Sequence, residues 1–273
     1  MKSKFFTSLA LATSITLLAG CSSPQDGQPN KPSESASDNA STPAEEPTPE
    51  PQPTEAEPAA PVREVPSECS ALTLDFNTTY SGAEFSKCVT AALTSFGSGR
   101  MDMYGDDLNG NVNFTYAPDY SFEVTGTSNG QATKLVYVGT EMWVDNGAGW
   151  IKGDINSSNQ EEMLAGLAGE LYRIYADPAM TAELIAGAQE WRSGAEFEMR
   201  GLPSGDTVEA YRIVNTQPFA WHDMQIQEFV MYYGKDWVPV GSSATSSMGG
   251  MAPMTYAQDF WDLGADISIK PPM

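Results

Sequence analysis

Alternation of apolar and polar residues dominates the stretch Gly99–Asp154. In Asn111–Tyr116 every second side chain is apolar, and the same spacing returns in Tyr120–Val124. A period of two predicts β-strands with one apolar and one polar face. The dipeptides Asn109-Gly110 and Asn129-Gly130 are typical of tight hairpin turns. The stretch is therefore predicted to be an antiparallel β-meander, and its apolar face needs a cover.

Three amphipathic helices are predicted to supply that cover. The first spans Gly82–Phe96, where apolar residues recur every three to four positions before the stop signal Gly97-Ser98-Gly99. After Asn159 the same spacing returns, and it is interrupted at Asp177-Pro178, where proline suits the first turn of a new helix. The apolar stripes of the two later helices contain Met163, Leu167, Leu171, Ile174, Met180, Leu184, Ala188 and Trp191.

Further strands are predicted on either side of the helical pair. Before it they occupy residues 133–138, 141–145 and 150–154, and after it residues 195–200, 208–214, 224–232, 237–240 and 266–270. The segment 241–254, rich in Ser, Gly and Met, is predicted to be a loop. The fold class is therefore α+β, with an antiparallel sheet covered by helices.

The N-terminus has the features of an export signal. Two lysines precede the apolar run Phe5–Leu18, which is too short to span a bilayer, so residues 1–20 are predicted to be a signal peptide. The run ends in Leu18-Ala19-Gly20-Cys21, which resembles a bacterial lipobox whose cysteine carries a diacylglyceryl group. Two acyl chains hold a protein stably at a membrane. The expected location is the extracytoplasmic face of the cell membrane; the alternative is a secreted protein with an incidental cysteine.

Residues 21–66 are predicted to be a lipidated cysteine followed by a disordered tether. Eleven of the 19 prolines fall in 22–66, together with Glu, Ser, Thr and Gln. Such a composition buries too little apolar surface to offset its chain entropy. A spacer through the cell wall or a ligand for a proline-binding module are alternative roles. The remaining residues, 67–273, form the predicted folded domain.

Charge and cysteine usage narrow the function further. The chain has a formal net charge of −22 and no cluster of Lys and Arg to neutralise phosphates, which disfavours nucleic acid as a partner. Such a charge also disfavours lying flat on an anionic leaflet. Outside the cell, Cys69 and Cys88 are expected to form a disulfide. A metal site with the single His222 is the weaker alternative, and a redox pair lacks the Cys-x-x-Cys spacing.

The order of elements resembles that of the actinobacterial LppX/LprG lipoproteins and the broader LolA-like half-barrels. The likeness covers residues 82–272 and is carried by Val136-Tyr137-Val138, Gly149–Lys152, Gly194–Gly201 and the terminal Gly264–Pro272. The resemblance implies a curved half-barrel sheet whose concave apolar face is covered by the N-terminal helix and the two inserted helices. It also implies that acyl chains of lipids or glycolipids sit between sheet and helices. The cysteine pair and the acidic domain and tether depart from this pattern.

A ligand cavity and an ordinary solid core would use the same residues. The sheet candidates are Val112, Phe114, Tyr116, Tyr120, Phe122, Val124, Phe197 and Met199, and the helix candidates are Met163, Leu167, Leu171, Leu184 and Trp191. If helices and sheet close tightly, these side chains form a core. If the two layers are held apart, the same side chains line an apolar cavity that an acyl chain fills. The sequence leaves both alternatives open.

Catalytic signals are weak. The Gly-x-Ser-x-Gly sequence Gly126–Gly130 ends in the Asn129-Gly130 hairpin turn and precedes no predicted helix, so it lacks the strand-to-helix context of a nucleophile elbow, and His222 lies in a predicted loop. The acidic turn Asp106–Asn109 lacks the length of an EF-hand loop and favours turn chemistry over Ca²⁺ binding. A glycosidase with paired carboxylates remains formally open. The expected function is a non-enzymatic, monomeric envelope lipoprotein without cofactor or metal that carries or presents a lipid or glycolipid, with any transporter partner unknown. The alternative is a cell-surface interaction or scaffold module with a solid core.

Overall fold

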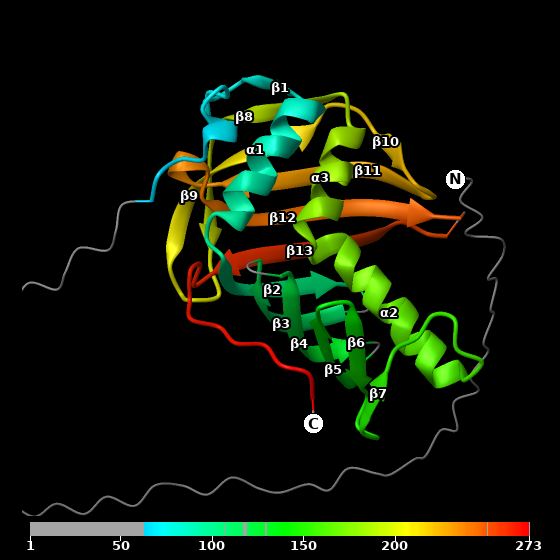
Figure 1. Ribbon diagram of the computed structural model, residues 1–273. Helices are drawn as coiled ribbons and strands as arrows, with labels where there is room; N and C mark the ends of the chain where they lie inside the picture. Colours follow the sequence, from blue (N-terminus) through cyan, green and yellow to red (C-terminus); the bar gives the residue numbers. More distant parts are fainter. Residues whose placement is uncertain (1–62, 107, 117–118, 129, 250, 273) are drawn as a thin grey trace, which may run out of the picture. The chain divides into compact units, whose positions relative to one another are not determined.

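The computed structural model describes residues 63–106, 108–116, 119–128, 130–249 and 251–272 (Figure 1). The predicted signal peptide, Cys21 and nearly all of the predicted tether lie outside these residues. Within the described part of the chain, no helix has the length and apolar character needed to cross a membrane.

The described residues form an α+β fold, as predicted. The helices are α1 (Gly82–Thr94), α2 (Gln160–Ala176) and α3 (Pro178–Gly187), with short 3-10 turns η1 (Ser67–Cys69) and η2 (Lys235–Trp237). The strands are β1 (Thr79–Ser81), β2 (Ser98–Gly105), β3 (Leu108–Thr115), β4 (Ser121–Ser128), β5 (Gln131–Val138), β6 (Glu141–Asp145), β7 (Trp150–Lys152), β8 (Glu190–Gly201), β9 (Thr207–Asn215), β10 (Phe219–Trp221), β11 (Met224–Tyr233), β12 (Pro239–Met248) and β13 (Met254–Trp261).

All these strands pair in one antiparallel sheet, which is curved and open. Its order is β1-β8-β9-β11-β12-β13-β2-β3-β4-β5-β6-β7, and β10 pairs with β11 off this path. The meander β2–β7 continues through β13 into the later strands, since β13 pairs with β2 (Tyr256 opposite Gly105). In Figure 1 the helices α1 and α3 lie side by side across β11, β12 and β13, while α2 lies over the β6–β7 end.

Helices α1 and α3 approach each other closely because their contact contains glycine. Ser81 caps α1 by accepting a hydrogen bond from the Glu84 backbone N–H at 3.3 Å. At Gly82, a Cβ atom would lie 1.9 Å from the carbonyl oxygen of Ala188, so a larger residue does not fit. Asp177 caps α3, with Pro178 at its first position, as the sequence predicts. The two helices therefore form one layer above the sheet.

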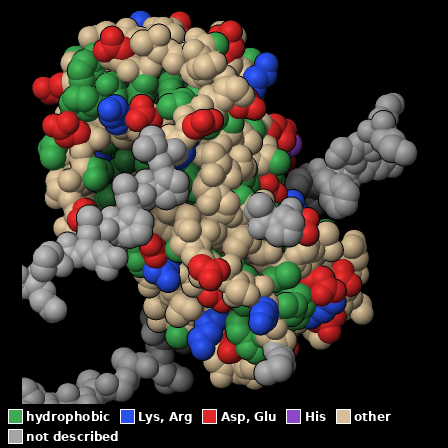
Figure 2. All heavy atoms as spheres, turned by 60° about the vertical axis from the view of Figure 1, so that its left-hand side comes forward, with side chains coloured by type: hydrophobic (Ala, Val, Ile, Leu, Met, Phe, Trp, Pro, Cys, Tyr) green, Lys and Arg blue, Asp and Glu red, His purple; other side chains and the backbone are tan. Residues whose placement is uncertain are grey.

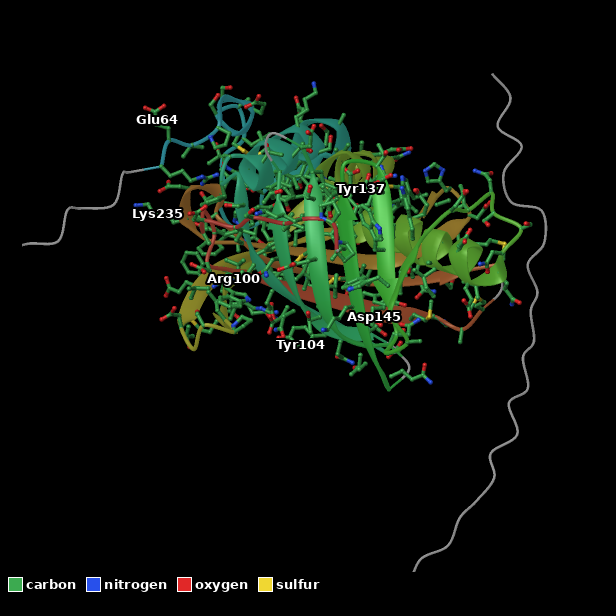
Figure 3. All side chains as sticks on the ribbon, turned by 60° about the horizontal axis from the view of Figure 1, so that its bottom comes forward. Glu64, Arg100, Tyr104, Tyr137, Asp145 and Lys235 are labelled. Atoms are coloured by element: carbon green, nitrogen blue, oxygen red, sulfur yellow. A yellow bond between two sulfur atoms is a disulfide. The ribbon has the colours of Figure 1, made fainter. Side chains whose placement is uncertain are left out.

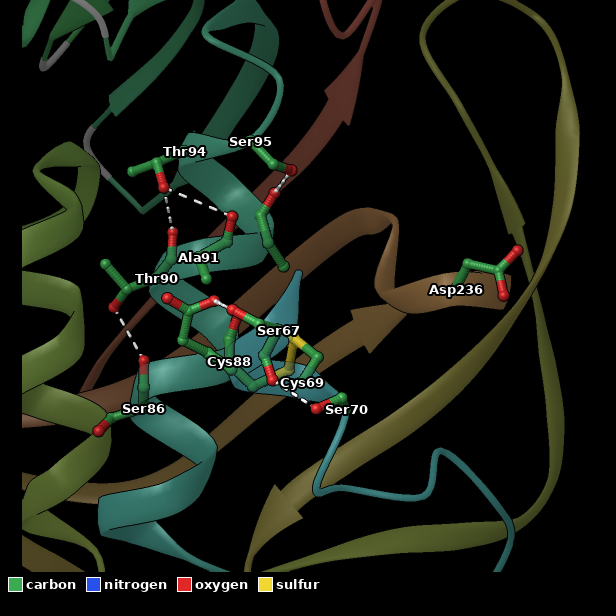
Figure 4. The surroundings of a disulfide bond; sticks show 12 residues. Ser67, Cys69, Ser70, Ser86, Cys88, Thr90, Ala91, Thr94, Ser95 and Asp236 are labelled. Carbon is green, nitrogen blue, oxygen red and sulfur yellow. Dashed lines mark hydrogen bonds between the residues drawn. A yellow bond between two sulfur atoms is a disulfide. The ribbon is translucent and has the colours of Figure 1, made fainter. Parts of the chain in front are cut away.

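The predicted disulfide is confirmed. Cys69 and Cys88 are bonded and buried, so η1 is joined to the middle of α1 (Figure 4). Nearby, the Arg63 side chain donates to the Ser95 hydroxyl and to the Asp236 carbonyl oxygen at 2.8 Å, and it lies over the Phe96 ring. The segment that enters the domain is therefore held at the C-terminal end of α1, where the positive charge of Arg63 also interacts favourably with the helix dipole.

The sheet face opposite the helices is polar over β2, β3 and β4. Arg100, labelled in Figure 3, pairs with Asp262 at 2.5 Å, and Asn113 donates to Glu123 at 2.6 Å. Met101 and Phe114, which alternate with these residues, are buried on the helix side. The alternation of the predicted meander is thus realised with its apolar face inward.

Several boundaries differ from the sequence-based predictions. The predicted loop 241–254 is mostly strand β12, in the middle of the sheet, because its small Ser and Ala residues fit under the helices. The predicted strand 266–270 is wrong: this segment has no regular secondary structure and pairs with no strand among the described residues. Trp191 belongs to β8, because α3 already ends at Gly187. Residues 237–240 divide between η2 and the start of β12, and β1, β10 and β13 were not anticipated.

Helix α2 turns a different face to the sheet from the one predicted. At Gly166 a Cβ atom would lie 2.7 Å from the Ile155 backbone nitrogen, and at Gly169 it would meet Met142 at the same distance. These glycines, with the buried Ala165, let the helix lie close to β6 and β7. Consequently Leu167 is 36% exposed instead of facing the sheet.

Candidate functional site

A small apolar cavity lies between helices α1 and α3 and the middle of the sheet. Its volume is about 30 Å³. The roof consists of Leu93, Thr181 and Leu184, and the floor and walls of Met101, Met103, Tyr116, Phe229, Met231, Tyr233, Pro239, Gly241, Ser242, Ala244, Tyr256, Ala257, Gln258 and Phe260. A space of this size holds about one or two water molecules.

Strand β12 makes the cavity possible. Ser242, Ala244 and Ser246 occupy alternate positions on its helix-facing side, and all three are buried. Their short side chains leave room under α1 and α3 that a Leu or Phe would fill. Met101, Met103 and Met231 flank the space, and methionine side chains adapt readily to changes in the volume around them.

Two polar atoms at this cavity have no hydrogen-bond partner among the described residues. One is the hydroxyl of Tyr233, a fully buried residue on β11, and the other is Oε1 of Gln258 on β13. The amide nitrogen of Gln258 does have a partner, since it donates to the Ser242 hydroxyl at 2.9 Å. Burial raises the pKa of Tyr233 well above its ordinary value, and the neighbouring Tyr116 adds to this effect. The Tyr233 hydroxyl therefore keeps its proton and can donate a hydrogen bond.

A second polar cluster adjoins the cavity at the α2–α3 junction. The rings of Tyr116 and Tyr120 stack with centroids 6.0 Å apart, and the Arg173 guanidinium lies over Tyr137 at 5.5 Å. Arg173 also pairs with Asp177 at 3.2 Å. Burial raises the pKa of both Tyr116 and Tyr120, with Asp177 a further cause. The Tyr120 hydroxyl and Arg173 Nε lack partners within the described structure.

The predicted cavity residues divide into three groups. Val112, Phe114, Phe122, Val124, Leu184 and Trp191 are buried in the main core cluster, and the half-buried Tyr116 and Tyr120 pack against it. Of all the candidates, Tyr116 and Leu184 line the cavity. Phe197, Met199 and Leu167 are exposed and Met163 is half-buried, so these four lie outside it. The side chain of Leu171 lies outside the described structure.

Phe197 and Met199 do not meet the helices as expected, because β8 carries a register shift between Ser193 and Phe197 and runs past the helical layer. They are 39% and 60% exposed. Phe197 packs edge-on against Phe76 and Tyr211, with ring centroids 4.8 and 4.7 Å away. We call Phe76, Phe197, Met199 and Tyr211 the β8–β9 cluster. Figure 2 shows hydrophobic side chains gathered on the side of the domain where β9 lies.

Sequence reasoning missed most of the cavity wall. Met101, Met103 and Met231 follow the same alternation as the predicted strands, so their inward direction was readable. Strand β12 also has a period of two, but its buried positions are the small residues Ser242, Ala244 and Ser246. A search for alternating hydrophobic residues does not detect such a strand. Tyr233 and Gln258 gave no local signal, because their lack of partners depends on the tertiary packing.

Other candidate groups hold no site. His222 lies 3.4 Å from Glu183 on the surface, remote from the cavity lining. Asp106 accepts a hydrogen bond from the Thr255 backbone N–H at 3.2 Å, and Asp107 is outside the described residues. In the described ranges, no three His, Cys, Asp or Glu side chains gather in a way that could hold a metal ion.

No protein-family model and no curated protein matches the chain. The structure itself defines the fold class: an α+β domain with an open, curved antiparallel sheet and helices on one face. Membership of the LppX/LprG family stays a prediction.

Proposed function

We propose that the protein is a membrane-anchored bacterial envelope lipoprotein that binds an acyl-chain-bearing lipid or glycolipid between the α1–α3 layer and the sheet. The observation that carries this proposal is the methionine-flanked cavity of about 30 Å³ in the middle of that interface. An acyl chain gains about 0.8 kcal/mol for each CH₂ group that it buries. The role is carriage or presentation of the lipid, without catalysis.

Binding requires this cavity to enlarge. Its present volume of about 30 Å³ holds one or two water molecules and is too small for an acyl chain. Helices α1 and α3 therefore have to move away from the sheet as a lipid enters. The layer is suited to this motion because β12 meets it with small side chains and β2 and β11 with methionines. The disulfide joins α1 to η1 and leaves α1 unlinked to the sheet.

Anchoring through Cys21 completes the proposal. The lipobox supplies the anchor, and the proline-rich residues 22–66 supply a tether that, fully extended, reaches on the order of 100 Å. Replacing Cys21 with serine should move the protein from the membrane fraction to the soluble envelope fraction. Retention of the Cys21→Ser variant in the membrane fraction would contradict the anchor.

The decisive test is mass spectrometry of the full lipidated protein purified from its own host. The mass under native conditions, compared with the mass after denaturation, reveals non-covalently bound lipid in excess of the covalent anchor. Ala244→Leu fills the cavity floor, and Thr245→Leu is its matched control on the opposite face of β12. We expect bound lipid in the wild type and in Thr245→Leu, and its loss in Ala244→Leu. Equal lipid content in all three proteins, or none in the wild type, overturns the proposal.

A cell-surface interaction module is the second candidate, and the β8–β9 cluster favours it. This aromatic patch lies beyond the helices and is open to a protein partner. Its test is cross-linking on intact cells followed by comparison of the wild type with Phe197→Ser. A defined partner that is lost in Phe197→Ser, together with an absence of bound lipid, would favour this function over lipid binding.

A further inference from the structure

The cavity wall is uncharged throughout. Its lining contains Leu, Met, Phe, Tyr, Pro, Ala, Gly, Ser, Thr and Gln side chains, and none of Asp, Glu, Lys, Arg or His. A charged group entering this space would lose its hydration without gaining a counter-ion, which is costly. The part of a ligand that occupies the cavity must therefore be neutral.

The two unpaired polar atoms describe that part more closely. A buried hydroxyl or amide oxygen without a partner costs stability, and Phe in place of Tyr233 would avoid the cost. Tyr233 can donate one hydrogen bond through its O–H group. Gln258 Oε1 can only accept, because an amide oxygen carries no proton, and the nitrogen of this amide already donates to Ser242. These two groups thus offer the cavity a free donor and a free acceptor.

A hydroxyl group is neutral and can both accept and donate a hydrogen bond, so it has the chemistry that Tyr233 and Gln258 require. Its oxygen accepts a hydrogen bond from Tyr233, and its proton is donated to Gln258 Oε1. A plain alkyl chain pairs with neither, an ester carbonyl only accepts, and a carboxylate brings a charge. We propose, resting on the lipid-binding function above, that the cavity selects an acyl chain that carries a hydroxyl group, recognised by Tyr233 and Gln258.

The test compares two neutral probes that differ by one hydroxyl group: methyl stearate and methyl hydroxystearate with the hydroxyl near the middle of the chain. Each is titrated into the full protein, freed of bound lipid in detergent, and the dissociation constants are measured by displacement of a fluorescent fatty-acyl ester. We expect the wild type to prefer the hydroxylated ester by about tenfold, since one extra satisfied buried pair is of that order.

Three variants assign the preference. Tyr233→Phe and Gln258→Leu should each lose most of the preference for the hydroxylated ester, so that the ratio of the two dissociation constants falls toward one in each variant. Tyr104→Phe makes the same chemical change on the exposed outer side of β2 and should keep the preference. Circular dichroism confirms that each variant is folded.

The outcomes separate this inference from the function on which it rests. If the wild type binds both esters equally, water satisfies the two polar atoms and the hydroxyl proposal fails, while lipid binding stands. If neither ester binds to the wild type, the proposed function itself fails. A preference that survives in both Tyr233→Phe and Gln258→Leu places hydroxyl recognition elsewhere and also overturns the inference.

Discussion

At the scale of single residues, the interior of this domain is unusual in its tyrosines. Tyr233 is buried, Tyr116 and Tyr120 are half-buried, and burial raises the pKa of all three. Tyr80 has the more common arrangement, because its buried hydroxyl donates to the Thr73 carbonyl oxygen at 3.0 Å. The Tyr80 hydroxyl therefore stabilises the fold through its hydrogen bond, whereas the Tyr233 hydroxyl does not.

The first prediction uses this contrast. Tyr233→Phe removes an unpaired hydroxyl and should raise the free energy of unfolding by about 1 kcal/mol, whereas Tyr80→Phe removes a satisfied hydrogen bond and should lower it by about as much. Urea denaturation of the two variants and the wild type measures both changes. A loss of stability in Tyr233→Phe as large as that in Tyr80→Phe would show that the Tyr233 hydroxyl has a partner in the folded protein.

At the scale of elements, the sequence was informative wherever the pattern was made of large residues. Phe85 and Val89 defined α1, and Val112 and Phe114 defined β3, because bulky side chains reveal which face is buried. The same reasoning failed on β12, which is buried by small residues, and on α2, where Gly166 and Gly169 make the contact. It also failed at Ile267 and Ile269, whose alternation is real but has no pairing strand.

The disulfide supports the second prediction. Cys69 and Cys88 are 19 residues apart, so their bond restricts the unfolded chain and joins η1 to α1. The double variant Cys69→Ser, Cys88→Ser should lose about 3 kcal/mol of stability in the chain-entropy account of cross-links. Urea denaturation of the oxidised wild type and the variant measures this difference. Ser86→Ala on the same helix serves as a control, and a comparably small effect in both proteins would contradict a stabilising role.

At the scale of the whole domain, the two faces of the sheet differ in their side chains. Its helix-facing side carries the core and the neutral cavity, while its other side carries paired charges such as Arg200 and Asp259 at 2.7 Å. Residues 67–273 contain 27 Asp and Glu and 10 Lys and Arg, and none of these side chains lines the proposed lipid site. Such a charge favours solubility of the tethered domain and does not attract the anionic leaflet beneath it.

Titration of these three tyrosines gives the third prediction. Because folding raises the pKa of Tyr116, Tyr120 and Tyr233, the unfolded chain loses these protons near the ordinary tyrosine pKa of about 10 while the folded chain keeps them. The folded state then binds more protons than the unfolded state, so stability is complete below about pH 10 and falls as pH rises further.

Each fully protected tyrosine steepens this fall by about 1.4 kcal/mol per pH unit, so the three together contribute about 4. Urea denaturation at intervals above about pH 9 measures the slope, and tyrosinate absorption in the ultraviolet reports when the rings ionise. Tyr120→Phe should reduce the slope by about 1.4 kcal/mol per pH unit, because it removes one protected proton. A slope unchanged in Tyr120→Phe, or tyrosinate absorption that appears before unfolding, would mean that water reaches these rings and that the interface between helices and sheet already opens at equilibrium.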